Sequence, residues 1–177
     1  FLFADLAAGL LWFTNLDDRN NLYIGGSFHH LNRANQSFST TGKDNLYSRL
    51  RVHAGGELMI GDRTGVIPGV IVMKQGPSFE LNAGTSLKWL LGGSRSVYQA
   101  FQLGGWVRLA DRYDQGILTD AAILSTRFDY NNFSLGFSYD INVSELSGAS
   151  NGNGAFEFAL VYKVCGQERR NVYCPNF

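Results

Sequence analysis

The stretch that decides the fold runs from residue 133 to residue 143 and reads Phe-Ser-Leu-Gly-Phe-Ser-Tyr-Asp-Ile-Asn-Val. Every odd-numbered position in it is apolar or aromatic, and every even-numbered position is polar or small. Successive side chains of a β-strand point to opposite faces of the sheet. The stretch therefore predicts a strand with one wholly apolar face and one wholly polar or small face.

The same alternation recurs along the chain. Residues 79–89 set Phe, Leu, Ala, Thr, Leu and Trp against Glu, Asn, Gly, Ser and Lys, and residues 156–164 follow a similar pattern. Weaker copies predict strands near residues 3–14, 21–31, 46–60, 65–74, 97–110 and 117–130. The segment 65–74 is apolar on both faces and contains Pro68, so its register is left open. This gives about nine strands, most of them near the roughly 9–11 residues that a tilted strand needs to span a bilayer.

Composition supports a membrane β-protein. Aromatic residues make up 14% of the chain and charged residues only 17%, against about 25% charged in soluble domains. Lys+Arg and Asp+Glu are both 15, so the basic excess that nucleic-acid binding needs is missing. No window of about 18 apolar residues predicts a transmembrane helix. We expect an all-β, antiparallel, up-and-down transmembrane β-barrel of the outer-membrane type, forming one domain over residues 1–177.

The predicted joins fall into two alternating classes. Joins at 15–20, 61–64, 92–96 and 131–132 are short, whereas the alternate joins at 32–45, 74–78, 111–115 and 144–154 include the two longest. Bacterial barrels have short periplasmic turns and longer outer loops, and an even number of strands. We therefore expect a periplasmic tail at 166–177. The odd strand count indicates either that strands are missing on the N-terminal side or that the count is wrong by one. The chain starts inside an apolar stretch without a leader, which indicates a mature or truncated chain.

The polar faces of the predicted strands carry charges of both signs. A charge facing lipid near the midplane costs a few kcal/mol, so we expect these to face the lumen: Arg49, Arg51, Glu57, Glu80, Lys88, Arg108, Arg127, Asp140, Glu157 and Lys163. The favoured interpretation is a salt-bridged, partly plugged lumen, and the alternative is an open, ion-selective pore. Trp12, Trp89, Tyr130 and Tyr162 suit interfacial girdles, while Trp106 falls on the inward face.

Motifs for catalysis are missing from the sequence. There is no G-x-S-x-G elbow and no H-E-x-x-H, so no enzyme activity and no cofactor are expected. His29 and His30 are adjacent on a predicted strand, so they should point to opposite faces and not share a metal ion. Cys165 and Cys174 could form a disulfide in an oxidising periplasm or remain two free thiols.

Several stretches together resemble the PorP/SprF family of the type IX secretion system in Bacteroidetes. They are Gly61-Asp62 with Ile67-Pro68, residues 73–77 with Glu80 and Gly84, residues 138–144, Leu146, Ala149-Ser150, residues 152–157, Leu160, Tyr162, and the ending Cys174-Pro175-Asn176-Phe177. Their order and spacing cover roughly residues 46–177, and residues 1–45 carry the likeness less well. Family members are longer and begin with a Gln-Asp-Pro and Asn-Pro-rich stretch that is absent here. The chain thus resembles the C-terminal part of such a protein.

The resemblance implies an outer-membrane barrel, in contact with outer-membrane lipid, that supports secretion or surface anchoring of cargo with a C-terminal sorting domain. Some members serve gliding motility by handling adhesins, and others associate with a periplasmic ring of lipoproteins. It implies no catalytic residue, cofactor or nucleic acid. Loops 32–45 and 144–154 would form a cargo rim or merely close hairpins, and the tail after Cys165 would contact a periplasmic partner, plug the interior or fray.

Three alternatives remain at this point. A general outer-membrane diffusion porin would share the same alternation and the same faces. A soluble lipocalin-like barrel would invert the faces and bury Phe133, Leu135 and Phe137 around an apolar ligand. A membrane-bound hydrolase would assemble Ser, His and Asp in space without any spacing signal.

Overall fold

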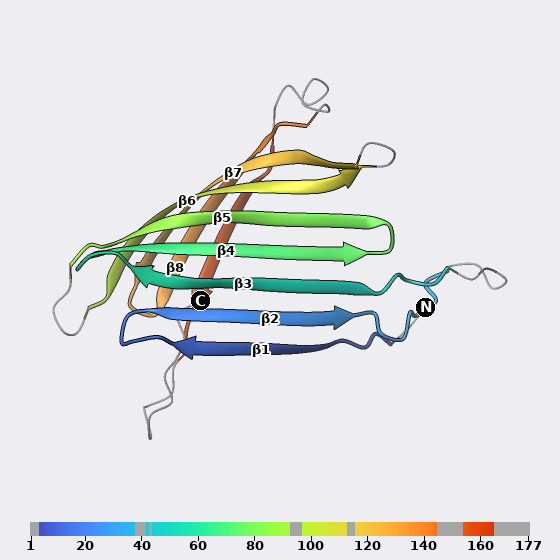
Figure 1. Cartoon of the computed structure of the whole chain (residues 1–177), viewed down its shortest axis with the longest axis horizontal. Coiled ribbons are helices and arrows are strands. Elements are labelled where there is room, and N and C mark those ends of the chain that lie inside the picture. The colour runs from blue at the N-terminus through green and yellow to red at the C-terminus, as the bar shows by residue number, and fades with distance from the viewer. Residues whose placement is uncertain are drawn as a thin grey trace.

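In the residues that the structure describes, the fold is a single antiparallel sheet of nine strands in simple up-and-down order. The computed structural model describes residues 4–37, 42, 44–92, 97–112, 116–144 and 154–164. The strands are β1 (Ala8–Asn15), β2 (Asn21–His29), β3 (Arg49–Met59), β4 (Thr64–Gln75), β5 (Ser78–Leu90), β6 (Gln99–Arg112), β7 (Gly116–Tyr130), β8 (Phe133–Asn142) and β9 (Phe156–Tyr162). Each strand pairs with the next one along the chain, which confirms the predicted architecture (Figure 1).

The strand boundaries match the alternation closely except at the start of the chain. The strand predicted from residue 3 begins at Ala8, because the preceding segment is held in another way. The Asn32 side chain donates to the Ala4 carbonyl at 2.7 Å and accepts from the Leu6 N–H at 3.3 Å. The Leu31 N–H also donates to the Leu6 carbonyl at 3.0 Å. Side-chain and backbone bonds together hold this segment, and alternation alone cannot distinguish that arrangement from a strand.

Pro68 lies inside a strand that has neighbours on both sides. Its pairing with Thr85 in β5 is regular, whereas the β3–β4 ladder passes from Gly55↔Gly69 directly to Leu58↔Val66. Proline has no N–H to donate, so the ladder is interrupted there without a shift of register. The register that the sequence left open is thereby fixed, with Pro68 on the same face as the apolar rows of the neighbouring strands.

The apolar side chains cover the outside of the sheet and do not form a core. In the described part of the chain, the buried hydrophobic residues are Ala100 and Ala121 alone, while Phe158 is 58% exposed and Leu160 is 63% exposed. Buried side chains are mostly polar or charged, with Lys88 among them. Such a surface is stable only against an apolar solvent. The lipocalin alternative, which needs these apolar rows inside, is therefore wrong.

The sheet curls strongly, so that its two ends face each other across a concave polar side. Figure 1 shows β6 to β8 turning behind β2 to β4. Within the described residues, β1 and β9 each pair on one side only and run in the same direction. The described residues include no helix that is long and apolar enough to cross a membrane. The concave side is where the charged residues converge.

Candidate functional site

The concave face carries all of the charges that the sequence placed on the polar faces. Strand register connects them, because directly opposed residues share a face. Glu80 is opposite Met73 of β4, and Met73 is in turn opposite Arg51 of β3. In the same way, Lys88 is opposite Gln102 of β6, which is opposite Arg127 of β7.

A buried ion pair crosses the concave face near the short turns. Lys88 of β5 places its Nζ 2.5 Å from Glu57 Oε1 of β3, and their side chains are only 4% and 15% exposed. The residue opposite Lys88 in the intervening strand is Gly65, which has no side chain to block the approach. The Lys88 ammonium also lies over the ring of Tyr98, 5.4 Å from its centroid. Both charges are thus partnered, as buried charges must be.

A second buried group surrounds the carboxylate of Asp129. Arg127 Nε donates to Asp129 Oδ1 at 2.8 Å, and Gln102 Nε2 donates to Asp129 Oδ2 at 3.0 Å. The Ser134 hydroxyl donates to Asp129 Oδ1 at 2.5 Å and accepts from Arg127 Nη2 at 3.1 Å. The carboxylate therefore has three donors, enough to offset much of the cost of its burial.

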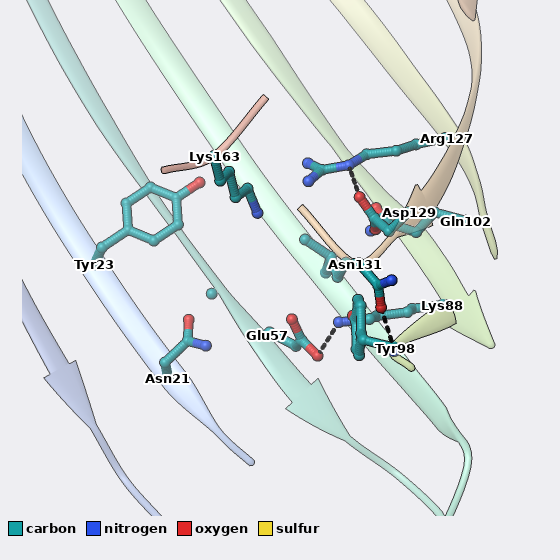
Figure 2. A pocket seen from close by; sticks show the side chains of 12 residues that line it. Asn21, Tyr23, Glu57, Lys88, Tyr98, Gln102, Arg127, Asp129, Asn131 and Lys163 are labelled. Atoms are coloured by element: carbon teal, nitrogen blue, oxygen red, sulfur yellow. Dashed lines mark hydrogen bonds and ion pairs between the residues drawn. The ribbon is translucent and has the colours of Figure 1, made fainter. Parts of the chain in front are cut away.

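The two groups meet around one small cavity of ≈ 60 Å³ (Figure 2). We call the two groups together with the residues around this cavity the short-turn network. The residues that line the cavity include Asn21, Glu57, Lys88, Tyr98, Gln102, Arg127, Asp129, Asn131 and Lys163. These residues lie in strands β2, β3, β5, β6 and β7 and in segments next to β6, β8 and β9. A cavity of this size holds no more than a few water molecules. The concave side is therefore nearly filled at this level.

Two residues at the edge of the network have shifted acidities. Burial raises the pKa of the Tyr98 phenol above its ordinary value, although the Lys88 ammonium opposes that rise. Burial, followed by the charge of Arg127, lowers the pKa of the Lys163 ammonium. Both shifts are those of groups held away from bulk water, which agrees with the small cavity between them.

The end nearest the long loops is organised differently. Arg108 contacts three carboxylates there: Asp140 at 2.6 Å, Glu80 at 3.8 Å and Asp120 at 3.8 Å. Asp120 reaches this position because the β6–β7 register shifts between Arg108 and Leu109, a bulge that adds one residue to β7. Alternation carries no signal for this bulge, so Asp120 was not among the predicted charges.

Arg49 and Arg51 occupy the same end on β3 without an ion pair to any described residue. Both are exposed, and Arg49 Nη2 lies 3.5 Å from the Met73 sulfur. Exposed charges need no partner, because water solvates them. The concave face thus has a tightly paired end at the short turns and a loosely paired, solvated end at the long loops.

The structure corrects the prediction for the histidine pair. β2 ends at His29, and His30 takes a left-handed conformation with φ of 58°, so the two rings do not point to opposite faces of a strand. Their centroids are 6.3 Å apart, and His30 pairs with Asp5 at 2.9 Å. Among the described residues, no group of three or more potential ligands could hold a metal ion. Cys165, Cys174 and the predicted tail lie outside the described residues.

The aromatic residues assigned to girdles lie on the apolar face. Trp89 stacks on Phe101 with centroids 6.1 Å apart, and Tyr162 packs against Phe133 at 4.7 Å. These pairs sit close to the short turns, and each side chain combines an apolar ring with an edge suited to the interface. Of the network residues that the prediction omitted, Ser134, Gln102 and Tyr98 share the polar phase of the strands predicted for them and could have been found by alternation. In the structure, β6 begins one residue after Tyr98, at Gln99.

An antiparallel sheet that is apolar outside and ion-paired inside defines a protein of the transmembrane β-barrel class. The sequence model of one family, described as the type IX secretion system membrane protein PorP/SprF, matches residues 1–162. The chain belongs to that family, and the match includes the N-terminal 45 residues in which the resemblance was weaker by eye. No curated protein and no solved structure matches the chain.

Family membership fixes the location and the broad role. The protein is an outer-membrane component of the type IX secretion system of Bacteroidetes. The family is a secretion-system membrane component and not a known enzyme family.

Proposed function

We propose that this barrel supports the secretion or surface anchoring of cargo proteins that carry a C-terminal sorting domain, and that it does not conduct small solutes as a general porin would. The observation that carries the proposal is the short-turn network. Its most buried members, Lys88, Asp129 and Ser134, are 3–4% exposed. In an open channel, charges on the inner wall stay in contact with water. Here they are removed from water and paired, which supports an interior that is blocked at that end.

The rim at the long-loop end is the proposed contact for cargo, including adhesins of gliding motility. Part of the first long loop is an ordered hairpin: Asn35 and Asn45 form an isolated bridge, and the Gln36 N–H donates to the Asp44 carbonyl at 2.9 Å. Arg33 lies over the ring of Tyr47 at 5.9 Å. Loops that a rigid scaffold positions in this way commonly carry binding function.

The opposite rim is the proposed contact for the periplasmic ring of lipoproteins. The first two short turns are joined there, because Arg19 Nη1 donates to the Asp62 carbonyl at 3.1 Å. Asp17 fixes the first turn by accepting from the backbone N–H groups of Arg19 at 2.8 Å and of Asn20 at 2.9 Å. These contacts hold the turns as one surface, and the tail that begins at Cys165 would extend it. A disulfide between Cys165 and Cys174 would restrain that tail.

The test is a deletion strain complemented with variants of the full-length protein. Removing residues 34–45 should abolish surface display of cargo with a C-terminal sorting domain, measured by mass spectrometry of medium and cell surface. The control is Gly61→Ala, whose added Cβ would have no atom within 4 Å, and it should retain display of cargo.

Purified wild-type protein should show no large, steady conductance in planar bilayers, because the network blocks the interior. A steady open pore in the wild type, or normal cargo display by the variant that lacks residues 34–45, would contradict the proposal. A steady pore together with normal display would favour the general diffusion porin.

A further inference from the structure

Two aromatic rings lie over a row of glycines at mid-height of the concave face. Gly55, Gly69 and Gly84 are register neighbours on β3, β4 and β5. Tyr23 of β2 pairs with the first, and Trp106 of β6 pairs with the last. A Cβ on Gly55 would lie 2.5 Å from the Tyr23 hydroxyl oxygen, and a Cβ on Gly69 would lie 3.0 Å from Trp106 Cη2. Each ring therefore occupies the space that side chains would fill.

The rings border a cavity of ≈ 390 Å³ that lies above the short-turn network. Ser86, Ser125 and Ser138 contribute hydroxyls to its lining, and Glu157 contributes a carboxylate. Gln102 and Arg127 belong both to this cavity and to the network, so the network forms its floor. The Trp106 Nε1–H donates to Ser125 Oγ at 3.2 Å, which fixes the orientation of the indole.

We propose that this cavity is a saccharide-binding site. Its volume lies within the range of about 300–1,000 Å³ that is usual for small-molecule pockets. A pyranose ring has an apolar face of C–H groups, which packs on the negative face of an aromatic ring, and a rim of hydroxyls that both donate and accept hydrogen bonds.

The lining offers both complements to such a ligand. The faces of Tyr23 and Trp106 provide the flat surface, and the serine hydroxyls, the Gln102 amide and the Glu157 carboxylate provide donors and acceptors around it. Some of these groups are already hydrogen-bonded to one another, since Ser125 Oγ accepts from Trp106 and Ser138 Oγ donates to Glu157 Oε2 at 3.4 Å. A carboxylate has about four lone-pair sites and a hydroxyl has two, so both kinds of group can still accept from sugar hydroxyls. The site is independent of the proposed secretion role, since it concerns the interior and not the rim.

The experiment titrates the full-length protein with glucose, mannose, fucose, N-acetylglucosamine and their short oligomers, followed by calorimetry and tryptophan fluorescence. The detergent must lack a sugar headgroup, because an alkyl glycoside would compete. We expect saturable binding that Trp106→Ala weakens about tenfold, the loss of one aromatic contact of roughly 1.4 kcal/mol. Trp12→Ala is the matched control, since Trp12 lies on the apolar face and is 57% exposed.

Folding of each variant is checked by heat-dependent migration on gels. Glu157→Gln is the second variant, because Glu157 is exposed and its substitution leaves the fold intact; we expect it to weaken binding several-fold. A titration with a glycopeptide and its deglycosylated form distinguishes free from protein-attached sugar. The proposal is overturned if no sugar in the panel saturates the folded wild type, if Trp106→Ala binds as the wild type does, or if the deglycosylated peptide alone binds in a Trp106-dependent manner.

Discussion

Replacing Lys88 by methionine tests the short-turn network directly. Methionine keeps most of the aliphatic stem but removes the ammonium that lies 2.5 Å from Glu57. The Glu57 carboxylate, 15% exposed, would then be left without its partner in a nearly closed interior. Removing one partner of a buried pair costs about 3–5 kcal/mol. Because Glu57 keeps some access to water, we expect a loss of about 3 kcal/mol in the free energy of unfolding.

The measurement is urea unfolding of the refolded full-length protein in lipid vesicles, followed by tryptophan fluorescence. Arg49→Met is the matched control: it removes a cation from the same face that is exposed and has no ion pair to a described residue, so it should cost less than about 0.5 kcal/mol. The double variant Glu57→Gln/Lys88→Met should recover at least about 1 kcal/mol of the loss. If Lys88→Met costs no more than Arg49→Met, or if the losses of Lys88→Met and Glu57→Gln simply add, the interior is not closed at the short turns.

Three further outcomes follow from the same geometry. Phe137→Lys places a charge on the apolar face and should cost about 2–4 kcal/mol in folding into bilayers, whereas Ser138→Lys, its neighbour on the concave face, should cost much less; equal losses would contradict the assignment of faces. Gly76→Ala should lower stability by about 1–2 kcal/mol in urea unfolding, because Gly76 has φ of +57° and an added Cβ would lie 2.7 Å from Tyr47 Cγ. Its control, Gly61→Ala, has open space around the added Cβ and should be neutral. The backbone N–H of Arg19 and the Asn20 amide lower the pKa of Asp17. The contribution of Asp17 to stability is therefore complete above about pH 4 and is lost as pH falls through the lowered folded-state pKa. The stability of Asp17→Ala should fall less steeply than that of the wild type below pH 4, and parallel pH profiles of the two proteins would refute this.

The strands and their faces could be predicted because they depend on local alternation. A period of two assigns every residue of 133–143 to a face before any partner is known, and the structure agrees over β8 (Phe133–Asn142). The prediction failed where the chain is held by something other than a ladder. Asn32 binds the segment before β1 through its side chain, and His30 leaves β2 through a left-handed turn. Neither event changes the apolar and polar pattern of the sequence.

The site was predictable in membership but not in pairing. Alternation put Glu57 and Lys88 on one face, but their contact depends on the curl of the sheet and on the small Gly65 between them. A separation of 31 residues carries no signal for such a contact. The three carboxylates around Arg108 depend in addition on the bulge that presents Asp120. Which charges form ion pairs depends on their height along the strands and on the curvature of the sheet. Both are set by the registers of all the strands together, and no local sequence pattern specifies them.

The uneven pairing along the concave face indicates where water reaches. An unpaired charge costs several kcal/mol when buried and almost nothing when solvated. Lys88 and Asp129 are buried and partnered on every side, whereas Arg49 and Arg51 are exposed and have no ion pair to a described residue. On the proposed function, the interior is nearly dry at the short turns and wet at the long loops. In the proposed orientation, this geometry is a vestibule that opens to the cell exterior and is closed toward the periplasm, which suits a protein that receives ligands at the surface and does not pass them through its own wall.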